Sequence, residues 1–353
     1  LGTLSATQLA ALGATQLAGL TDSQMAAMTT TMLASLSGTQ IGSLSPDQLN
    51  SLPTESIATL STAQIRGLTP AQLDRLDTRA AAALAPTQLA ALTTTQLQQL
   101  NTESLNVLTA TQSAALTTAQ IAALTTTQIE GLRAADVSDL ADTQIAALTP
   151  AQLSALTTTA LAGLSPDDMA SLSVAQIQGL TGAGMAALGT MQFAALTSTQ
   201  VAALSATQLA GLTAAQIAGA TGTQLAALTA QQLSALTTTA ISGMAPAQIA
   251  ALSTTQLQGL SGNGIGALGS AQLAALTRTQ IANLAPTQIG ALSSTQVTVL
   301  TATQFSALTP VQIASISNSG IAGLTAEKLQ ALSRTQLQNL TPAQIGAFLK
   351  VLV

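Results

Sequence analysis

The chain has 353 residues, of which 47% are hydrophobic and 6% are charged, and its net charge is −5. Typical globular domains have about a quarter of their residues charged. The sequence contains no His or Cys, which excludes Ser-His-Asp and Cys-His nucleophiles, disulfides and thiolate metal sites. Its eight Lys and Arg form no basic stripe for nucleic acid. No apolar run approaches the ~18 residues of a membrane span. We therefore expect a protein that is not an enzyme and has no cofactor, nucleic-acid partner or membrane span.

An eight-residue repeat runs through the whole sequence. Gln occupies 31 of the 43 positions from 8 to 344 whose number is divisible by eight. The next residue is Leu, Ile, Val, Met or Phe except at Ala81 and Ser113, and a Leu or a substitute follows four residues after each Gln position. No insertion breaks this register, so the chain lacks the variable loops on which enzymes usually place their sites.

A longer period of 80 residues is superimposed on the octads. Gln is absent at two sets of positions that recur at this spacing: Ala80, Ala160, Ala240 and Gly320, and Ser104, Gly184 and Gly264. Two interpretations stay open. Ten octads are the product of gene duplication, or they form a structural or assembly repeat.

Each octad carries the signals that start a helix. The position three residues before the Gln slot is Ser, Thr, Asp or Asn in 34 of 43 octads, and with Gln it makes a capping box. Nine of the ten prolines follow this cap position directly, at the first helical position: Pro46, Pro70, Pro86, Pro150, Pro166, Pro246, Pro286, Pro310 and Pro342. The pattern predicts one helix of about six residues per octad.

Short helices must stack to be stable, which predicts an all-α solenoid over residues 1–348. A β-solenoid is the alternative, because an even period suits strands. However, the main apolar positions, such as Ile129 and Leu132, are three apart and share a helix face. Small residues before the main Leu, such as Gly131, allow close helix approach. Two octads per coil would give a rod on the order of 200 Å, but the sequence does not fix that number.

Candidate chemistry in the sequence is sparse. Arg133 lies among four acidic residues, which form either a solvated surface or, alternatively, a calcium site without an EF-hand pattern: Glu130, Asp136, Asp139 and Asp142. The pair Asp167-Asp168 suits the first turn of a helix. The segments 182–184 and 262–264 are too incomplete for a phosphate loop. We predict no catalytic, cofactor-binding or metal-binding residues.

Two features favour assembly. Residues 169–277 contain no charged side chain, so a free surface of this kind would self-associate unless glycan on Ser and Thr, or a larger wall, covers it. The segment 349–353 is predicted to be a separate apolar tail, which either joins copies head to tail or folds back onto the last coil. The repeated Gln has two interpretations, a helix cap or a stacked Gln ladder along the solenoid.

The unit from Leu148 to Leu156, Leu-Thr-Pro-Ala-Gln-Leu-Ser-Ala-Leu, resembles octapeptide arrays in long secreted or surface proteins of Gram-negative bacteria. Such proteins are described as adhesin-like or haem-utilisation-like, but a chain without His, Cys or Tyr has few axial ligands for haem. The resemblance implies an extracellular or cell-surface protein. We expect a structural filament, stalk, adhesin stalk or surface-layer component. The alternative is a ligand-binding surface, specifically ice binding, because Thr-x-Thr recurs, as at residues 125–127 and 197–199.

Overall fold

The computed structural model describes the backbone of residues 5–352, and the side chains of these residues except 347, 348 and 350–352. This part of the chain is helical and contains no strand. The predicted all-α solenoid is therefore confirmed, and the β-solenoid alternative is wrong. The chain divides into two compact units, unit 1 (Leu1–Gly179) and unit 2 (Leu180–Val353). None of the helices within residues 5–352 is long and apolar enough to cross a bilayer.

Unit 1 has one short helix in each octad. We name each octad by the residue number of its Gln position. Octad 160 differs from the others in unit 1, because its helix is a 3-10 helix, η1. The elements are α1 (Ala6–Ala10), α2 (Ala14–Ala18), α3 (Asp22–Ala26), α4 (Thr30–Ala34), α5 (Gly38–Gly42), α6 (Pro46–Asn50), α7 (Thr54–Ala58), α8 (Thr62–Arg66), α9 (Pro70–Asp74), α10 (Thr78–Ala83), α11 (Pro86–Ala91), α12 (Thr94–Leu97), α13 (Thr102–Asn106), α14 (Ala110–Ala114), α15 (Thr118–Ala123), α16 (Thr126–Glu130), α17 (Ala134–Ser138), α18 (Asp142–Ile145), α19 (Pro150–Ala155), η1 (Ala160–Gly163), α20 (Pro166–Ser171) and α21 (Val174–Gly179).

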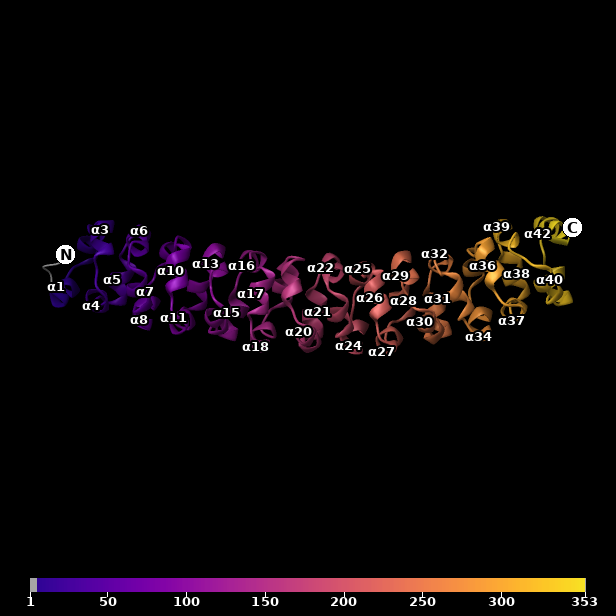
Figure 1. Ribbon diagram of the computed structural model, residues 1–353, viewed down its shortest axis with the longest axis horizontal. Helices are drawn as coiled ribbons and strands as arrows, with labels where there is room; N and C mark the ends of the chain where they lie inside the picture. The colour runs from indigo at the N-terminus through magenta and orange to yellow at the C-terminus, as the bar shows by residue number, and fades with distance from the viewer. Residues whose placement is uncertain (1–4, 353) are drawn as a thin grey trace. The chain divides into compact units, whose positions relative to one another are not determined.

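Unit 2 continues the same pattern, and Figure 1 labels most of its helices. They are α22 (Gly182–Ala187), α23 (Thr190–Ala194), α24 (Ser198–Ala202), α25 (Ala206–Ala210), α26 (Ala214–Gly219), α27 (Gly222–Ala226), α28 (Ala230–Ser234), α29 (Thr238–Ser242), α30 (Pro246–Ala251), α31 (Thr254–Gly259), α32 (Gly262–Gly266), α33 (Ser270–Ala274), α34 (Arg278–Ala282), α35 (Pro286–Gly290), α36 (Ser294–Val299), α37 (Ala302–Ser306), α38 (Pro310–Ser315), α39 (Asn318–Ile321), α40 (Ala326–Gln330), α41 (Arg334–Gln338) and α42 (Pro342–Leu352). The division between repeat and tail at residue 349 stays a prediction, because Val353 and the side chains of 350–352 lie outside the described residues.

The helices begin where the capping signals predict. Before α16, Thr125 has extended backbone (φ −71°, ψ 157°), and its side chain accepts the Gln128 N–H. Before α19, Thr149 does the same for Gln152, and Pro150 is the first helical residue. Each helix then ends after about one and a half turns, because the next cap residue must be extended.

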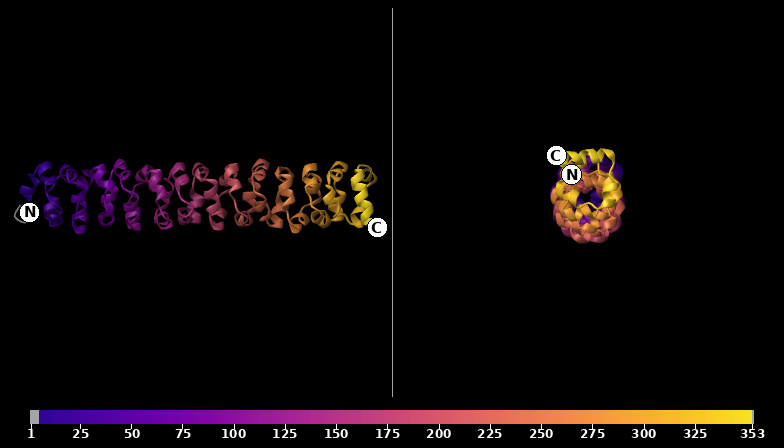
Figure 2. Two further views of the ribbon diagram at one scale, coloured as in Figure 1. Left: turned by 90° about the horizontal axis from the view of Figure 1, so that it is seen from above. Right: turned by 90° about the vertical axis from the view of Figure 1, so that its right-hand side faces the viewer.

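The helices wind into coils that stack within each unit (Figure 2). Helix α16 packs on α19 in unit 1, and α32 packs on α35 in unit 2, three octads apart in each case. Side-chain contacts between successive coils join residues 25, 28, 30 and 31 positions apart. A coil therefore takes more than three octads and fewer than four, not two. The 80-residue period corresponds to about three coils.

The two apolar positions of each octad fill the inside of the coils. Ile129, directly after a Gln, is 0% exposed, and Leu148, four residues after another, is 3% exposed. The small residue before the main Leu allows the close approach predicted from the sequence. A Cβ added at Gly67 would lie 2.1 Å from the carbonyl oxygen of Gly38 in the neighbouring coil.

Candidate functional site

The repeated Gln joins two coils through one buried side chain. Gln128 Oε1 accepts the backbone N–H of its own cap residue, Thr125, at 2.9 Å. Its Nε2 donates to the carbonyls of Leu97 at 2.8 Å and Leu100 at 2.7 Å, 31 and 28 residues earlier. These carbonyls lie at the end of α12, where a helix runs out of backbone donors; the Leu97 carbonyl also accepts the Leu100 N–H at 3.1 Å. One carboxamide therefore caps the start of its own helix and the end of a helix in the preceding coil.

We call this arrangement the glutamine bridge. Its Nε2 bond to the carbonyl 28 residues earlier is 2.6–3.0 Å long throughout, and it is made by Gln40, Gln48, Gln64, Gln72, Gln88, Gln96, Gln112, Gln120, Gln128, Gln144, Gln152 and Gln176 in unit 1, and by Gln208, Gln216, Gln224, Gln232, Gln248, Gln256, Gln272, Gln280, Gln288, Gln296, Gln304, Gln312, Gln336 and Gln344 in unit 2. The capping interpretation is confirmed. The ladder exists in another form, since the Gln nitrogens donate to backbone carbonyls of the neighbouring coil.

Other side chains replace the bridge in several octads that lack Gln. In octad 80, Asn50 Oδ1 accepts the N–H of the cap residue Asp77 at 3.1 Å. Arg79 donates to the carbonyls of Leu52, at 3.0 Å, and Asn50. Two residues thus supply the acceptor and the donors that Ala80 lacks. No sequence pattern indicates these pairs, because finding them requires the number of residues per coil.

Octads 104 and 56 use a different substitution. Ser104 Oγ donates to the Leu76 carbonyl at 2.8 Å, and Asn101 Nδ2 donates to the same carbonyl at 3.0 Å. In octad 56 the cap residue is Pro53, which has no N–H to satisfy. Ser56 Oγ lies 3.4 Å from the Met28 carbonyl. Octads 80 and 104 thus supply another donor for the carbonyl, and octad 56 has no cap N–H to satisfy.

Octad 328 places a cation in the bridge position. Lys328 is 5% exposed, and its Nζ donates to the Thr298 carbonyl at 2.7 Å. Burial lowers the pKa of Lys328, and the charge of Glu327 partly opposes this shift. The ammonium donates to the helix end, but it has no lone pair to accept the cap N–H.

The acidic residues that were predicted to form a solvated surface or a calcium site have separate local roles. Asp136 accepts the N–H of its cap residue Arg133 at 2.7 Å and pairs with the guanidinium, also at 2.7 Å. This hydrogen bond raises the pKa of Arg133. Glu130 is exposed, Asp142 lies in the first turn of α18, and Asp139 is the C-cap of α17. No three acidic residues in the described part of the chain come together in a way that could hold a metal ion.

The remaining candidates also lie at helix starts. Asp168 in the first turn of α20 accepts the Ser165 N–H at 2.8 Å, so the first-turn interpretation is confirmed. Gly184 donates its N–H to Thr181 Oγ1 at 2.9 Å, and Gly264 donates to Ser261 Oγ at 3.0 Å. Both glycine segments are ordinary helix starts.

A small cavity of about 30 Å³ lies inside the coils of unit 1. It lies where Ser113 stands in place of the apolar residue found in other octads. Asp136, Leu132 and Leu140 also line it, and the two leucines are half-buried instead of buried. The missing side-chain volume at Ser113 accounts for the cavity.

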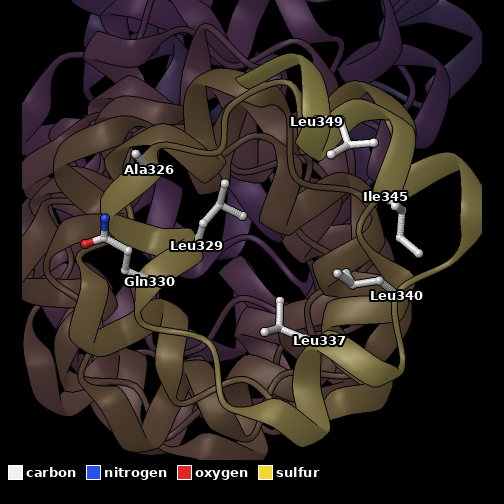
Figure 3. Close-up of a pocket in the computed structure, with 7 residues that line it drawn as sticks. All are labelled: Ala326, Leu329, Gln330, Leu337, Leu340, Ile345 and Leu349. Carbon is white, nitrogen blue, oxygen red and sulfur yellow. The ribbon is translucent and has the colours of Figure 1, made fainter. Parts of the chain in front are cut away.

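A second, open cavity of about 470 Å³ lies on the last described coil (Figure 3). Its lining comes from helices α40 to α42 and is almost entirely apolar: Ala326, Leu329, Gln330, Leu337, Leu340, Ile345 and Leu349. Leu337, Ile345 and Leu349 are 44%, 45% and 59% exposed. Leu337 and Ile345 directly follow a Gln, a position that is fully buried inside the stack, as at Ile289.

Comparison with known families assigns the octapeptide. Three segments, residues 161–198, 185–221 and 249–286, match the ALTTAQ repeat family. The same register continues on both sides of these segments, and the letters Ala-Leu-Thr-Thr-Ala-Gln themselves occur at residues 115–120. No curated protein matches the chain. In this chain, an octad with Gln is thus a helix with its own cap and a bridge to the preceding coil.

Proposed function

We propose that this repeat chain is a structural, non-catalytic component of an extracellular bacterial filament, stalk or surface layer. The observation that carries the proposal is a long uncharged surface on a stack of short helices that are joined by glutamine bridges.

The surface composition supports assembly and an extracellular location. Residues 180–277 of unit 2 carry no charge, and Met191 on this segment is 71% exposed. Neighbouring copies can approach such a surface with little electrostatic repulsion. It can pack side by side in a wall or carry O-linked glycan on its Ser and Thr residues. The absence of Cys is compatible with export but does not require it.

Sedimentation and electron microscopy of the 353-residue chain test the proposal over a range of concentrations. We expect particles larger than one chain, and Met191→Asp, which adds a charge to the uncharged surface of unit 2, should disperse them. Leu349→Asp is the matched control, because it adds the same charge to an exposed apolar position outside residues 180–277. A chain that stays monomeric at high concentration contradicts the proposal, as would equal dispersal by both variants.

Ice binding is the second candidate, and one observation favours it. Exposed or half-exposed threonines occupy the first position of five helices that stack on one another in unit 1: Thr30, Thr54, Thr78, Thr102 and Thr126. Against it, the first Thr of a Thr-x-Thr segment already serves as a cap, as Thr125 does for Gln128 N at 3.2 Å. Thermal hysteresis that disappears in Thr78→Leu would support ice binding, and its absence in the unmodified chain excludes it.

A further inference from the structure

A groove of about 340 Å³ crosses three successive coils of unit 1, and we call it the polar groove. It runs from the end of α9, past the end of α12 and the start of α13, to the start of α16. Its volume is in the range of small-molecule sites, about 300–1,000 Å³. Apart from one leucine its lining is polar: Asp74, Gln98, Gln99, Leu100, Asn101, Thr102, Thr125, Thr127 and Gln128.

The same groove occurs in unit 2 with a plainer lining. It has a volume of about 570 Å³, and Ala226 and Ala230 stand there in the places of Gln98 and Thr102, each 128 residues later in the chain. The stack therefore forms this groove between its coils without the larger polar side chains. We infer that packing of the coils does not require the polar lining in unit 1.

Two further residues of the polar groove differ from their counterparts in unit 2. Gln99 stands at the small-residue position before the main Leu, where unit 2 has Ala227. Asp74 corresponds in the same register to Ala202. The polar groove is therefore narrower than its counterpart because its small residues are replaced by longer side chains that can form hydrogen bonds.

Many hydrogen-bonding groups of the polar groove are unused by the fold. Within the described part of the chain, the Asp74 carboxylate, the Gln99 carboxamide and the Thr102 hydroxyl make no hydrogen bond. Gln98 Nε2 donates to the Ala123 carbonyl at 2.8 Å, which leaves its Oε1 as an acceptor. Asp74 and Gln99 are exposed, so these groups are accessible to a molecule in the groove.

The free groups restrict the chemistry of a ligand. The described lining contains no Lys or Arg, so an anion would meet the Asp74 carboxylate without a compensating charge. A cationic amine could donate to Asp74, but it would leave the donors of Gln99 and Thr102 unused. A neutral saccharide fits the whole set, because each of its hydroxyl groups both donates and accepts. Leu100, at 2% exposed, provides an apolar floor for the C–H groups of a sugar ring.

We propose that the polar groove of unit 1 binds a neutral saccharide and that its counterpart in unit 2 does not. In this site Asp74 accepts hydrogen bonds from sugar hydroxyl groups, and Gln99 and Thr102 both donate and accept. The inference does not depend on the proposed assembly, because all of these residues belong to one chain.

NMR titration of the full-length 15N-labelled chain tests the proposal with three probes, maltotriose, cellotriose and chitotriose, each added separately. We expect at least one of them to shift the side-chain amide signals of Gln98 and Gln99. The backbone amide signals of Ala226 and Ala230 in the counterpart groove should stay unchanged. Spermidine, added in a fourth titration, reports whether the groove takes a cationic amine instead.

Two variants copy the alanines of unit 2 into the polar groove. Asp74→Ala and Gln99→Ala should each weaken saccharide binding about tenfold or more, because each removes hydrogen bonds to the ligand. Both should leave the melting temperature nearly unchanged. Asp167→Ala, which removes an exposed carboxylate outside the groove, is the control and should bind as the unmodified chain does. The proposal is overturned if none of the three saccharides shifts the signals, if spermidine alone shifts them, or if Asp167→Ala weakens binding as much as Asp74→Ala.

Discussion

Gln152 Nε2 donates to the carbonyl of Leu124 at 2.9 Å, although the two residues are 28 positions apart and belong to successive coils. Its Oε1 accepts the N–H of Thr149, its own cap residue, at 2.7 Å. The same side chain therefore acts in a local contact and in a long-range one. Substitutions at Gln152 and Thr149 can measure the two contributions separately.

Removal of the bridge should cost more than removal of a cap. Gln152→Ala leaves a buried N–H and a buried carbonyl without partners, and we expect a loss of about 1–3 kcal/mol in the free energy of unfolding. Thr149→Ala should cost about 1 kcal/mol, the usual value for one cap. Gln152→Glu keeps the acceptor but loses the donor, so it should fall between wild type and alanine only at pH values low enough to protonate the new carboxyl. Chemical denaturation measures all three, and equal losses would show that the contact between coils contributes nothing.

A charge in the core should unfold several octads at once. Leu148 is 3% exposed, so Leu148→Asp buries a carboxylate without a partner and should cost several kcal/mol. The effect should extend to neighbouring octads, because each helix is held by the coils on either side. Hydrogen exchange followed by mass spectrometry measures how many neighbouring octads lose protection. Ala151→Asp is the control, since Ala151 is exposed in the first turn of α19, and it should change little. Similar small effects would show that Leu148 is not a core position.

A larger side chain at residue 113 should fill the cavity beside Ser113. Ser113→Leu restores the residue type found at this position in most octads, and we expect a gain of about 1–3 kcal/mol in the free energy of unfolding. Ala114→Leu places the same side chain on an exposed neighbour and should give no comparable gain. Thermal unfolding compares the two. A destabilised Ser113→Leu variant would show that the cavity is too small and that the hydroxyl has a role of its own.

Lys328→Gln should stabilise the chain in a pH-dependent way. Because burial lowers the pKa of Lys328 in the folded state, the unfolded chain binds more protons at this site as the pH approaches the ordinary lysine value. The stability of the wild type therefore rises with pH in that window. We expect Lys328→Gln to be more stable by about 1 kcal/mol near neutral pH, where the wild type buries a charge. The difference should narrow between the lowered pKa and the ordinary value near 10.5. A constant difference across that window would show that the folded chain does not oppose the charge.

The sequence predicts the helices well and the coil poorly, for physical reasons. A cap such as Thr125 and its partner Gln128 lie three residues apart, so local spacing contains all the information that the helix start requires. The coil depends on how far each helix turns relative to the last, which the eight-residue period does not encode. Asn50 and Asp77 are 27 residues apart, and their pairing becomes visible only when the length of a coil is known.

The sequence predicts only part of the candidate site. The oxygen of the repeated Gln was predicted correctly as a cap, whereas the role of its nitrogen depends on the neighbouring coil. The open face of α40–α42 and the cavity beside Ser113 also depend on which octads lie above and below. Once the contact at 28 residues is known, the spacing identifies each bridge, including the substitution in which Lys328 reaches Thr298.

The direction of the glutamine bridges along the chain favours one order of folding during synthesis. Each bridging Gln donates to a carbonyl that lies 28 residues earlier, as Gln304 does to Leu276 at 2.7 Å. A ribosome therefore releases the acceptors of every bridge before it releases the donor. An emerging octad finds a finished coil on which to close, and no octad needs residues that are still to be synthesised in order to complete its own bridge. Vectorial synthesis and the direction of the hydrogen bonds thus favour the same order of folding, one octad at a time.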